Sequence, residues 1–436
     1  MLKKTFLFVI LLNILLFSGP VLDYPDFYLY NGGLPRQIET LRYVADEIIV
    51  KPSLAGMIPA RRTKLLGKYQ DRLLEAQSIN GLGLISLKTK PGVSLAELKK
   101  ELAAESWVAD ISLNYLAGAF RLPNDQHFGF QYALHNTGQT IVPAVSYTGT
   151  SGADIKALEG WDWSISSENV VVAVIDTGIH FQHEDLKNKI VPGYNFVHDN
   201  NHPQDDDGHG TMVASVIAAE TDNNIGVAGV AWNALIMPLK ALDSTGSGTY
   251  TAIALAIRYA ADSGAAIINL SLGGPVDSFI LRDACNYAAQ KGVLLVAATG
   301  NDTAEVKYPA AYTELVLAVG ASDAHDQLAV FSNYGPQVDL VAPGVYVLCA
   351  YFNKANPENT RSYAWASGTS LAAPHVSGAA ALLMAIKPGL NASQVSALIC
   401  YTADDVNRVN YPGKDDYMGY GRLNLKTLLA PYLLKK

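Results

Sequence analysis

The sequence predicts an α/β protein built on a doubly wound, mostly parallel sheet, preceded by a small α+β domain. Three observations lead to this fold class. Short, continuous apolar runs, typical of strands buried on both faces, recur after about residue 123. Stretches of helical periodicity separate these runs. The region before them alternates between strand and helix patterns over a much shorter length. In doubly wound sheets, ligands collect at the carboxyl ends of the strands, so chemistry is expected there.

The chain is long and apolar enough for one large domain and a smaller one. It has 436 residues, of which 49% are hydrophobic and 17% are charged, so disorder is not expected. Its three cysteines cannot all pair with one another and stand in apolar segments, which favours buried free thiols; no zinc-ligand spacing is present. They are Cys285, Cys349 and Cys400.

Residues 1–20 have the order of a secretory signal peptide. Lys3 and Lys4 precede an almost unbroken apolar run from Phe6 to Phe17, and small residues and Pro20 follow. An uncleaved N-terminal anchor is the alternative. In both cases the rest of the chain is expected outside the cytoplasm, either extracellular or periplasmic. Because no later segment has about 18 uninterrupted apolar residues, the mature form is expected to be free of the membrane.

Residues 21–121 are predicted to form the small α+β domain, which is close to the lower size at which a domain is stable unaided. Its strand patterns cover 46–52, 82–89 and 108–116, and its helical patterns cover 61–74 and 94–105. This region carries no catalytic set of residues.

Residues 122–436 are predicted to form the large domain. The strand-like runs cover 170–178, 234–242, 265–274, 292–301, 315–322 and 338–344. The helical stretches between them cover 207–220, 248–264 and 277–292. Strands that alternate with helices in this way build a parallel sheet.

The two regions differ in charge. Residues 22–121 have 13 Lys and Arg against 11 Asp and Glu, whereas residues 122–436 have 17 against 29. Opposite net charges suit two parts that dock on each other, although a solvated face is the simpler explanation of any charge bias. The acidic main region disfavours a nucleic-acid partner.

Four polar residues stand where the predicted strands end or helices begin. Asp176 closes VAVIDTGI, Asn301 closes ATGN, and His209 lies between two glycines at the start of a small-residue helix. Ser370, in GTSLAAPH, precedes a long apolar helical run. Taken singly, Asp176 and Asn301 could be turn formers and Ser370 a helix cap. Pro374, four residues after Ser370, weakens the helix-cap interpretation, because a residue that only caps a helix does not need a proline there.

Together these residues suit nucleophilic catalysis, because a serine hydroxyl is inert at neutral pH until a base takes its proton and a carboxylate orients that base. Their chain order is Asp, His, Ser. On the motifs VAVIDTGI, HGTMVAS, ATGN and GTSLAAPH, with 33, 92 and 69 residues between successive members, the chain resembles the subtilisin-like serine peptidases. The likeness runs from about residue 124 to residue 428 and is strongest to the thermitase-type branch.

The resemblance implies a role for each residue. Asp176 orients the imidazole of His209, His209 is the general base, and Ser370 is the nucleophile. Asn301 donates to the oxyanion, as does the backbone amide of Ser370. Three positions depart from the family pattern without removing a catalytic atom. They are Met212 in place of a second histidine, Leu371 in place of methionine, and Ser377 in place of a small apolar residue.

The resemblance also implies the substrate-binding segments, between which an extended peptide would add as a strand. They are Ser271, Leu272, Gly273 and Gly274, and opposite them Gly246, Ser247 and Gly248. A flexible loop is the alternative for the second segment. The absence of a GxGxxG motif after the first strand excludes dinucleotide binding.

A structural calcium site is implied by the likeness of residues 222–229 to the family's calcium loop, since hard oxygen ligands of mixed type suit this ion. The implied ligands are Asp125, Asp185, Thr221, Asn223, Ile225 and Val227. A second site at the acidic run 205–207 is doubtful, and a solvated acidic loop is the simpler explanation.

The resemblance implies that residues 21–121 are a pro-region that assists folding and blocks the substrate cleft. It also implies that the protein removes this region by cutting itself between Leu116 and Leu122. We therefore expect a secreted, calcium-stabilised, monomeric serine endopeptidase that acts on peptides or proteins. A catalytically silent, peptide-binding relative is the alternative.

Overall fold

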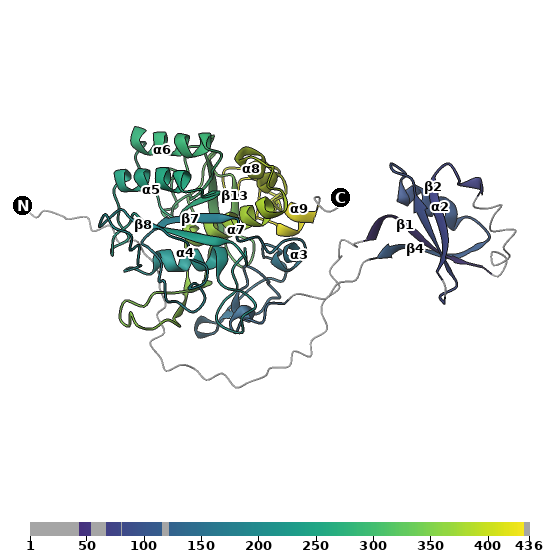
Figure 1. The fold of residues 1–436 in the computed structure, drawn as a ribbon, viewed down its shortest axis with the longest axis horizontal. Helices are drawn as coiled ribbons and strands as arrows, with labels where there is room; N and C mark the ends of the chain where they lie inside the picture. The colour runs from purple at the N-terminus through teal and green to yellow at the C-terminus, as the bar shows by residue number, and fades with distance from the viewer. Residues whose placement is uncertain (1–42, 54–66, 80, 116–121, 431–436) are drawn as a thin grey trace, which may run out of the picture. The chain divides into compact units, whose positions relative to one another are not determined.

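The structure is a computed structural model that describes residues 43–53, 67–79, 81–115 and 122–430. The chain forms two compact units, divided between residues 120 and 121, and each is described here by itself (Figure 1). The predicted signal peptide and the interval 116–121 lie outside the described residues.

The first unit is a four-stranded antiparallel sheet, ordered β2-β3-β1-β4, with helix α2 packed against it. Its elements are β1 (Tyr43–Pro52), β2 (Leu73–Ile79), β3 (Leu84–Thr89), α2 (Leu95–Ala103) and β4 (Val108–Tyr115). Ile48, Leu87 and Leu98 are fully buried in its core. The Ser94 hydroxyl caps α2 by accepting from the Glu97 amide. The predicted small α+β class is confirmed.

One predicted element of this unit is wrong in part. The helix expected over 61–74 begins outside the described residues, and its last two residues, Leu73 and Leu74, belong to strand β2. This strand has no counterpart among the predicted ones. β2 lies at the sheet edge with most of its side chains exposed, so no apolar alternation marks it in the sequence.

The second unit is built on a seven-stranded sheet whose strands all pair in parallel, in the order β13-β12-β11-β10-β7-β9-β8. The strands are β7 (Val171–Asp176), β8 (Tyr194–Asn195), β9 (Leu235–Lys240), β10 (Ile267–Leu270), β11 (Leu294–Ala298), β12 (Val316–Ser322) and β13 (Leu340–Pro343). All six predicted runs are confirmed as strands. The seventh, β8, has two residues and was not predicted.

Helices cover both faces of this sheet (Figure 1). The longer ones are α4 (His209–Ala218), α5 (Tyr250–Asp262), α6 (Phe279–Gln290), α7 (Thr369–Ile386) and α8 (Ala392–Tyr401). The shorter elements are η1 (Phe128–Phe130), β5 (Thr140–Val142), η2 (Pro143–Val145), β6 (Tyr147–Thr148), α3 (Ala157–Trp161), β14 (Val347–Ala350), β15 (Tyr363–Ala366) and α9 (Leu425–Leu429). The doubly wound architecture is therefore confirmed.

Alternate strand residues pack into separate cores on the two faces. Val172 and Val174 face the core that contains residues of α4 and α7, whereas Ala173 and Ile175 face the core formed with α5 and α6. Because both faces are covered, the strands are apolar throughout, which explains the continuous runs in the sequence.

Helix α7 is the central helix of this domain. By length and composition it could cross a membrane, but 83% of the relevant window is buried inside the unit. Its small residues allow close packing: a side chain on Gly378 would collide with Val230. The three cysteines are free and buried, as predicted.

The strand order creates a switch point between β7 and β10. After β7 the chain forms β8 and β9 on one side of it, and from β10 it moves outward on the other side to β11, β12 and β13. A crevice forms outside the carboxyl ends of the strands at such a point, which is where ligands bind in this architecture.

Candidate active site

Asp176 is the last residue of β7, at the switch point, and it is fully buried. Its Oδ1 accepts hydrogen bonds from the Thr177 backbone amide at 2.7 Å and from His209 Nδ1 at 2.8 Å. Within the described part of the chain, Oδ2 has no partner. The carboxylate is thus held in place and directed at the imidazole.

His209 is the first residue of α4, and the glycines beside it allow the close contacts around it. Gly208 has φ 114°, and a side chain there would meet the Tyr351 ring at 2.6 Å. A side chain on Gly210 would lie 2.1 Å from the carbonyl oxygen of Gly178, next to Asp176. Both glycines are therefore needed to bring the helix start against the strand end.

Asp205 ties this helix start to the end of β7. Its carboxylate is 1% exposed and accepts hydrogen bonds from Thr177 Oγ1 at 2.8 Å and from the Gly208 and Thr211 amides at 2.9 and 3.0 Å. Burial raises its pKa. The expectation of a solvated acidic loop is wrong for Asp205, because an acidic side chain at this position satisfies the free amides of a helix start.

The imidazole of His209 has a strongly shifted affinity for protons. Burial lowers its pKa, but the charge of Asp176 and the hydrogen bond to it, together with the charges of Asp207 and Asp205, outweigh burial and raise the pKa to about 9. The side chain remains 14% exposed, so the imidazole is not fully enclosed.

Ser370 is the second residue of α7 and is 6% exposed. It does not cap the helix: the cap position is Gly368, and no side chain makes a capping hydrogen bond there. The interpretation of Ser370 as a helix cap is therefore wrong. The hydroxyl remains available at a helix N-terminus, where backbone donors and the helix dipole favour negative charge.

Asn301 lies beside Ser370 and is oriented by Thr369. The Asn301 Oδ1 accepts from the Thr369 amide at 2.8 Å and from its hydroxyl at 2.9 Å, and that hydroxyl accepts from the Gly300 amide at 3.1 Å. This arrangement turns Nδ2 of Asn301 toward Ser370. A side chain on Gly368 would begin 2.9 Å from Ser370 Oγ and 3.3 Å from Asn301 Nδ2, so the two groups border one small space.

A cluster of buried side chains brings the start of α4 close to the start of α7. Met212, one turn after His209, and Leu371, next to Ser370, pack in one core with Tyr351. Among the described residues no hydrogen bond joins the Ser370 hydroxyl to His209. Such contacts are often loose without substrate and tighten in the complex.

The segments expected to bind substrate border this site. Ser271 follows β10 and is buried, whereas Gly273 is exposed and, in the described chain, makes no backbone hydrogen bond. Gly274 exchanges two backbone hydrogen bonds with Tyr308, each of 2.9 Å. The segment 246–248 is partly to fully exposed and precedes α5, whose Tyr250 hydroxyl contacts Gly274 and Val276. Leu272 is half-buried between Ser271 and Gly273.

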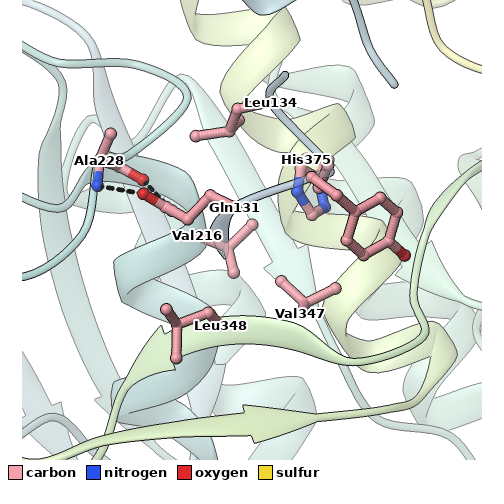
Figure 2. Close-up of a pocket in the computed structure, with 9 residues that line it drawn as sticks. Gln131, Leu134, Val216, Ala228, Val347, Leu348 and His375 are labelled. Carbon is pink, nitrogen blue, oxygen red and sulfur yellow. Dashed lines mark hydrogen bonds between the residues drawn. The ribbon is translucent and has the colours of Figure 1, made fainter. Parts of the chain in front are cut away.

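A small internal cavity lies elsewhere, beneath α4 and α7 (Figure 2). His375, Val216, Val347 and Gln131 are among its lining residues, and none of the four candidate catalytic residues is. Burial lowers the pKa of His375 to about 4, so this side chain is neutral. The cavity belongs to the interior and not to the crevice at the strand ends.

The predicted metal ligands meet in one place. Asp125 and Asp185 are 5% and 0% exposed, and burial raises their pKa values to about 6 and about 7, with the charge of Asp125 adding to the effect on Asp185. Asp125 Oδ1 is buried without a partner in the described residues. Asn223 donates to Asp185 at 3.2 Å. Two buried carboxylates with a spare oxygen suit a cation.

The carbonyl groups of the loop fit the same conclusion. Within the described chain no hydrogen bond ends on the carbonyl oxygens of Thr221, Ile225 or Val227. No group of three or more His, Cys, Asp or Glu side chains that could hold a metal occurs there either. A site of two carboxylates and several neutral oxygens fits calcium better than zinc.

Sequence reasoning missed two residues that shape the site. Thr369 orients Asn301, and Asp205 joins the ends of β7 and α4. Thr369 stands inside the GTS motif and Asp205 opens an acidic run four residues before His209, so both were visible in the sequence. However, Asn301 lies 68 residues from Thr369, and Thr177 lies 28 residues from Asp205.

A doubly wound parallel sheet with a serine, a histidine hydrogen-bonded to a buried aspartate, and an oriented amide at its carboxyl edge defines the class of serine peptidases with this fold. The model of the family described as "Subtilase family" matches residues 167–421. The chain belongs to the subtilase family of serine peptidases.

Known relatives agree with this assignment. The chain is 43% identical over 312 residues to the thermophilic serine proteinase of Bacillus sp. (strain AK1), covering 71% of this chain and 70% of that protein. It is 43% identical over 272 residues to thermitase of Thermoactinomyces vulgaris, covering 62% and 91%. A solved structure of the proteases from Pseudoalteromonas arctica PAMC 21717 matches with a TM-score of 0.63 and 28% identity, over 72% of this chain and 100% of that one.

Proposed function

We propose that this subtilase is a secreted endopeptidase in which Ser370 is the nucleophile, His209 the general base and Asp176 the orienting carboxylate. The observation that carries the proposal is the part-buried His209–Asp176 hydrogen bond of 2.8 Å at the switch point, with Ser370 on the neighbouring helix start. Because Nδ1 is bound to Asp176, Nε2 of His209 is the nitrogen left to take the proton of the serine.

The residues divide the reaction into two acyl transfers. His209 Nε2 takes the proton of Ser370 Oγ as the oxygen attacks the peptide carbonyl, and the resulting imidazolium is stabilised by Asp176. The Asn301 amide and the Ser370 backbone N–H donate to the oxyanion. The imidazolium then protonates the leaving amine, and a water molecule activated by the same base releases the acyl group from Ser370.

A serine-directed fluorophosphonate probe tests this assignment. We expect the wild type to be labelled, Ser370→Ala to remain unlabelled, and the matched variant Ser367→Ala, three residues upstream, to be labelled like wild type. Absence of labelling in the wild type would instead favour a silent, peptide-binding relative.

The proposed substrate is an extended peptide that adds as a strand beside Ser271, Leu272, Gly273 and Gly274, opposite Gly246, Ser247 and Gly248. The exposed backbone of Gly273 supports this, since backbone pairing binds a peptide of any sequence.

Replacing Asn301 with alanine is expected to lower kcat by roughly a hundred- to a thousandfold with little change in KM, because the amide donates only to the developing oxyanion. Steady-state kinetics on a chromogenic peptide measures this. The neighbouring, exposed Asp302→Ala should behave like wild type. A raised KM with an unchanged kcat would contradict the role.

The pH profile should carry the signature of His209. Only the neutral imidazole can take a proton, so kcat/KM is lost as pH falls through the pKa of the free enzyme. Because nearby carboxylates raise this pKa to about 9, the acid limb should lie above the ordinary value of 6.5. Asp207→Asn should move the limb to lower pH, and Asp206→Asn, whose carboxylate pairs with Lys240, should not. A limb that does not move in Asp207→Asn contradicts this explanation.

We further propose that calcium stabilises the fold through Asp125, Asp185, Asn223 and the carbonyls of Thr221, Ile225 and Val227. When bound, the ion would neutralise the two buried carboxylates. At a hundredfold excess over its dissociation constant it adds about 2.7 kcal/mol, so chelation should lower the melting temperature by roughly 5 °C or more. Calorimetry with and without chelator measures this. Asp185→Asn should abolish the response, and Asp222→Asn, on the same loop, should keep it.

The chain is proposed to be a monomeric zymogen with residues 1–20 as signal peptide, residues 21–121 as the inhibitory pro-region and residues 122–436 as the peptidase. The opposite charges of the two regions support docking. Mass spectrometry of secreted protein should find the mature N-terminus near 116–122, and Ser370→Ala should stay full length. A fully active form that begins before residue 60 contradicts the idea. The compartment, extracellular or periplasmic, follows from fractionation.

A further inference from the structure

Pro374 deprives Ser370 of a hydrogen bond that a helix normally supplies. In an α-helix the N–H of residue 374 would donate to the carbonyl of residue 370, but proline has no N–H. A buried carbonyl without a donor is costly. Here the donor is Ser271, whose hydroxyl lies 2.8 Å from the Ser370 carbonyl oxygen.

Two further buried side chains set the direction of the Ser271 hydroxyl. Asn269 Nδ2 donates to Ser271 Oγ at 2.9 Å, and Ser377 Oγ donates to Asn269 Oδ1 at 2.8 Å. Asn269 and Ser377 are 0% exposed and Ser271 is 5% exposed. Each group donates to the next, so the chain of hydrogen bonds runs in one direction and ends on Ser370.

The orientation of the Asn269 side-chain amide decides whether the series of hydrogen bonds reaches the Ser370 carbonyl. With the Ser377 hydroxyl as donor, Oδ1 must face α7 and Nδ2 must face Ser271. Without that donor, the amide can turn over and present Oδ1 to Ser271. The Ser271 hydroxyl would then donate to Asn269, and the Ser370 carbonyl would lose its partner.

We propose that Ser377 and Asn269 are positioning residues for the nucleophile: they hold the Ser271 hydroxyl on the Ser370 carbonyl and so fix the Ser370 backbone. This rests on the proposed role of Ser370. Asn301 holds the backbone N–H of Thr369, one residue before the nucleophile, and the Ser271 hydroxyl holds the carbonyl of Ser370 itself. The hydrogen bonds link four buried groups, from the hydroxyl of Ser377 to the carbonyl of Ser370.

The primary test is Ser377→Ala. Active sites are counted by fluorophosphonate titration, so that misfolded protein does not lower the apparent kcat. We expect kcat to fall roughly three- to tenfold with KM unchanged, the scale of one lost buried hydrogen bond. The control is Ser164→Ala, because the Ser164 hydroxyl donates at 2.9 Å to the Leu382 carbonyl, far along the same helix. It should lower the melting temperature and leave kcat unchanged.

A double-mutant cycle tests whether Ser377 and Ser271 act through one connected series of hydrogen bonds or affect kcat independently. Ser271→Ala removes the last donor, so adding Ser377→Ala to it should cost no further kcat. An unchanged kcat in titrated Ser377→Ala, or effects that multiply in the double variant, would overturn the proposal. Failure of Ser370 as nucleophile would appear differently, because the wild type itself would then not titrate.

Discussion

Ser370→Ala is expected to lower kcat by about six orders of magnitude, the scale found when the nucleophile of subtilisin is removed. Without Oγ no acyl intermediate can form, and the remaining activity comes from substrate binding and the oxyanion donors. Single-turnover kinetics on a chromogenic peptide, with a long time course, measures the residual rate.

The fold should survive this change. The Ser370 side chain makes no hydrogen bond within the described chain, and alanine suits a helix start buried among small residues. The melting temperature and the affinity for a peptide inhibitor should therefore stay near those of wild type. A variant that keeps more than a few per cent of wild-type kcat would show that another residue is the nucleophile.

The central sheet was predictable because its strands are covered on both faces. Every residue of β7 through β13 that packs into either core must be apolar, so the runs stand out without alternation. The strand that escaped prediction, β8, has two residues and pairs only with the end of β9. In the first unit, β2 escaped for a different reason: it is an edge strand with most side chains in solvent.

The candidate site was predictable only as far as motifs reach. Asp176, His209, Asn301 and Ser370 each stand in a recognisable segment, but the contacts that support them cannot be read from those segments. Thr369 is hydrogen-bonded to Asn301, 68 residues away in the sequence, and Ser377 to Asn269, 108 residues away. Such partners depend on which strand lies next to which helix, and local patterns do not carry that information.

Ser377 illustrates the limit. In the sequence it is a small departure from the family pattern, without an evident consequence. In the structure it faces the end of β10, because α7 packs across the neighbouring strands there. The partner of its hydroxyl is Asn269, so the role proposed for Ser377 depends on tertiary packing.

Asp176→Asn is expected to lower kcat by about four orders of magnitude while the fold is kept. Asn would retain an oxygen for the Thr177 amide and for His209 Nδ1–H, both of which now end on Oδ1. The tautomer of the imidazole can therefore persist, and the loss comes chiefly from the missing charge, which no longer stabilises the imidazolium formed during attack.

The pH profile distinguishes loss of charge from loss of orientation. Since the charge of Asp176 is the strongest of the influences that raise the pKa of His209, Asp176→Asn should move the acid limb of kcat/KM to lower pH as the rate falls. An inverted tautomer would instead leave no competent base at any pH and hence no limb attributable to His209. Asp206→Asn, at a half-buried residue paired with Lys240, controls for general charge. A kcat within tenfold of wild type would remove Asp176 from the catalytic set.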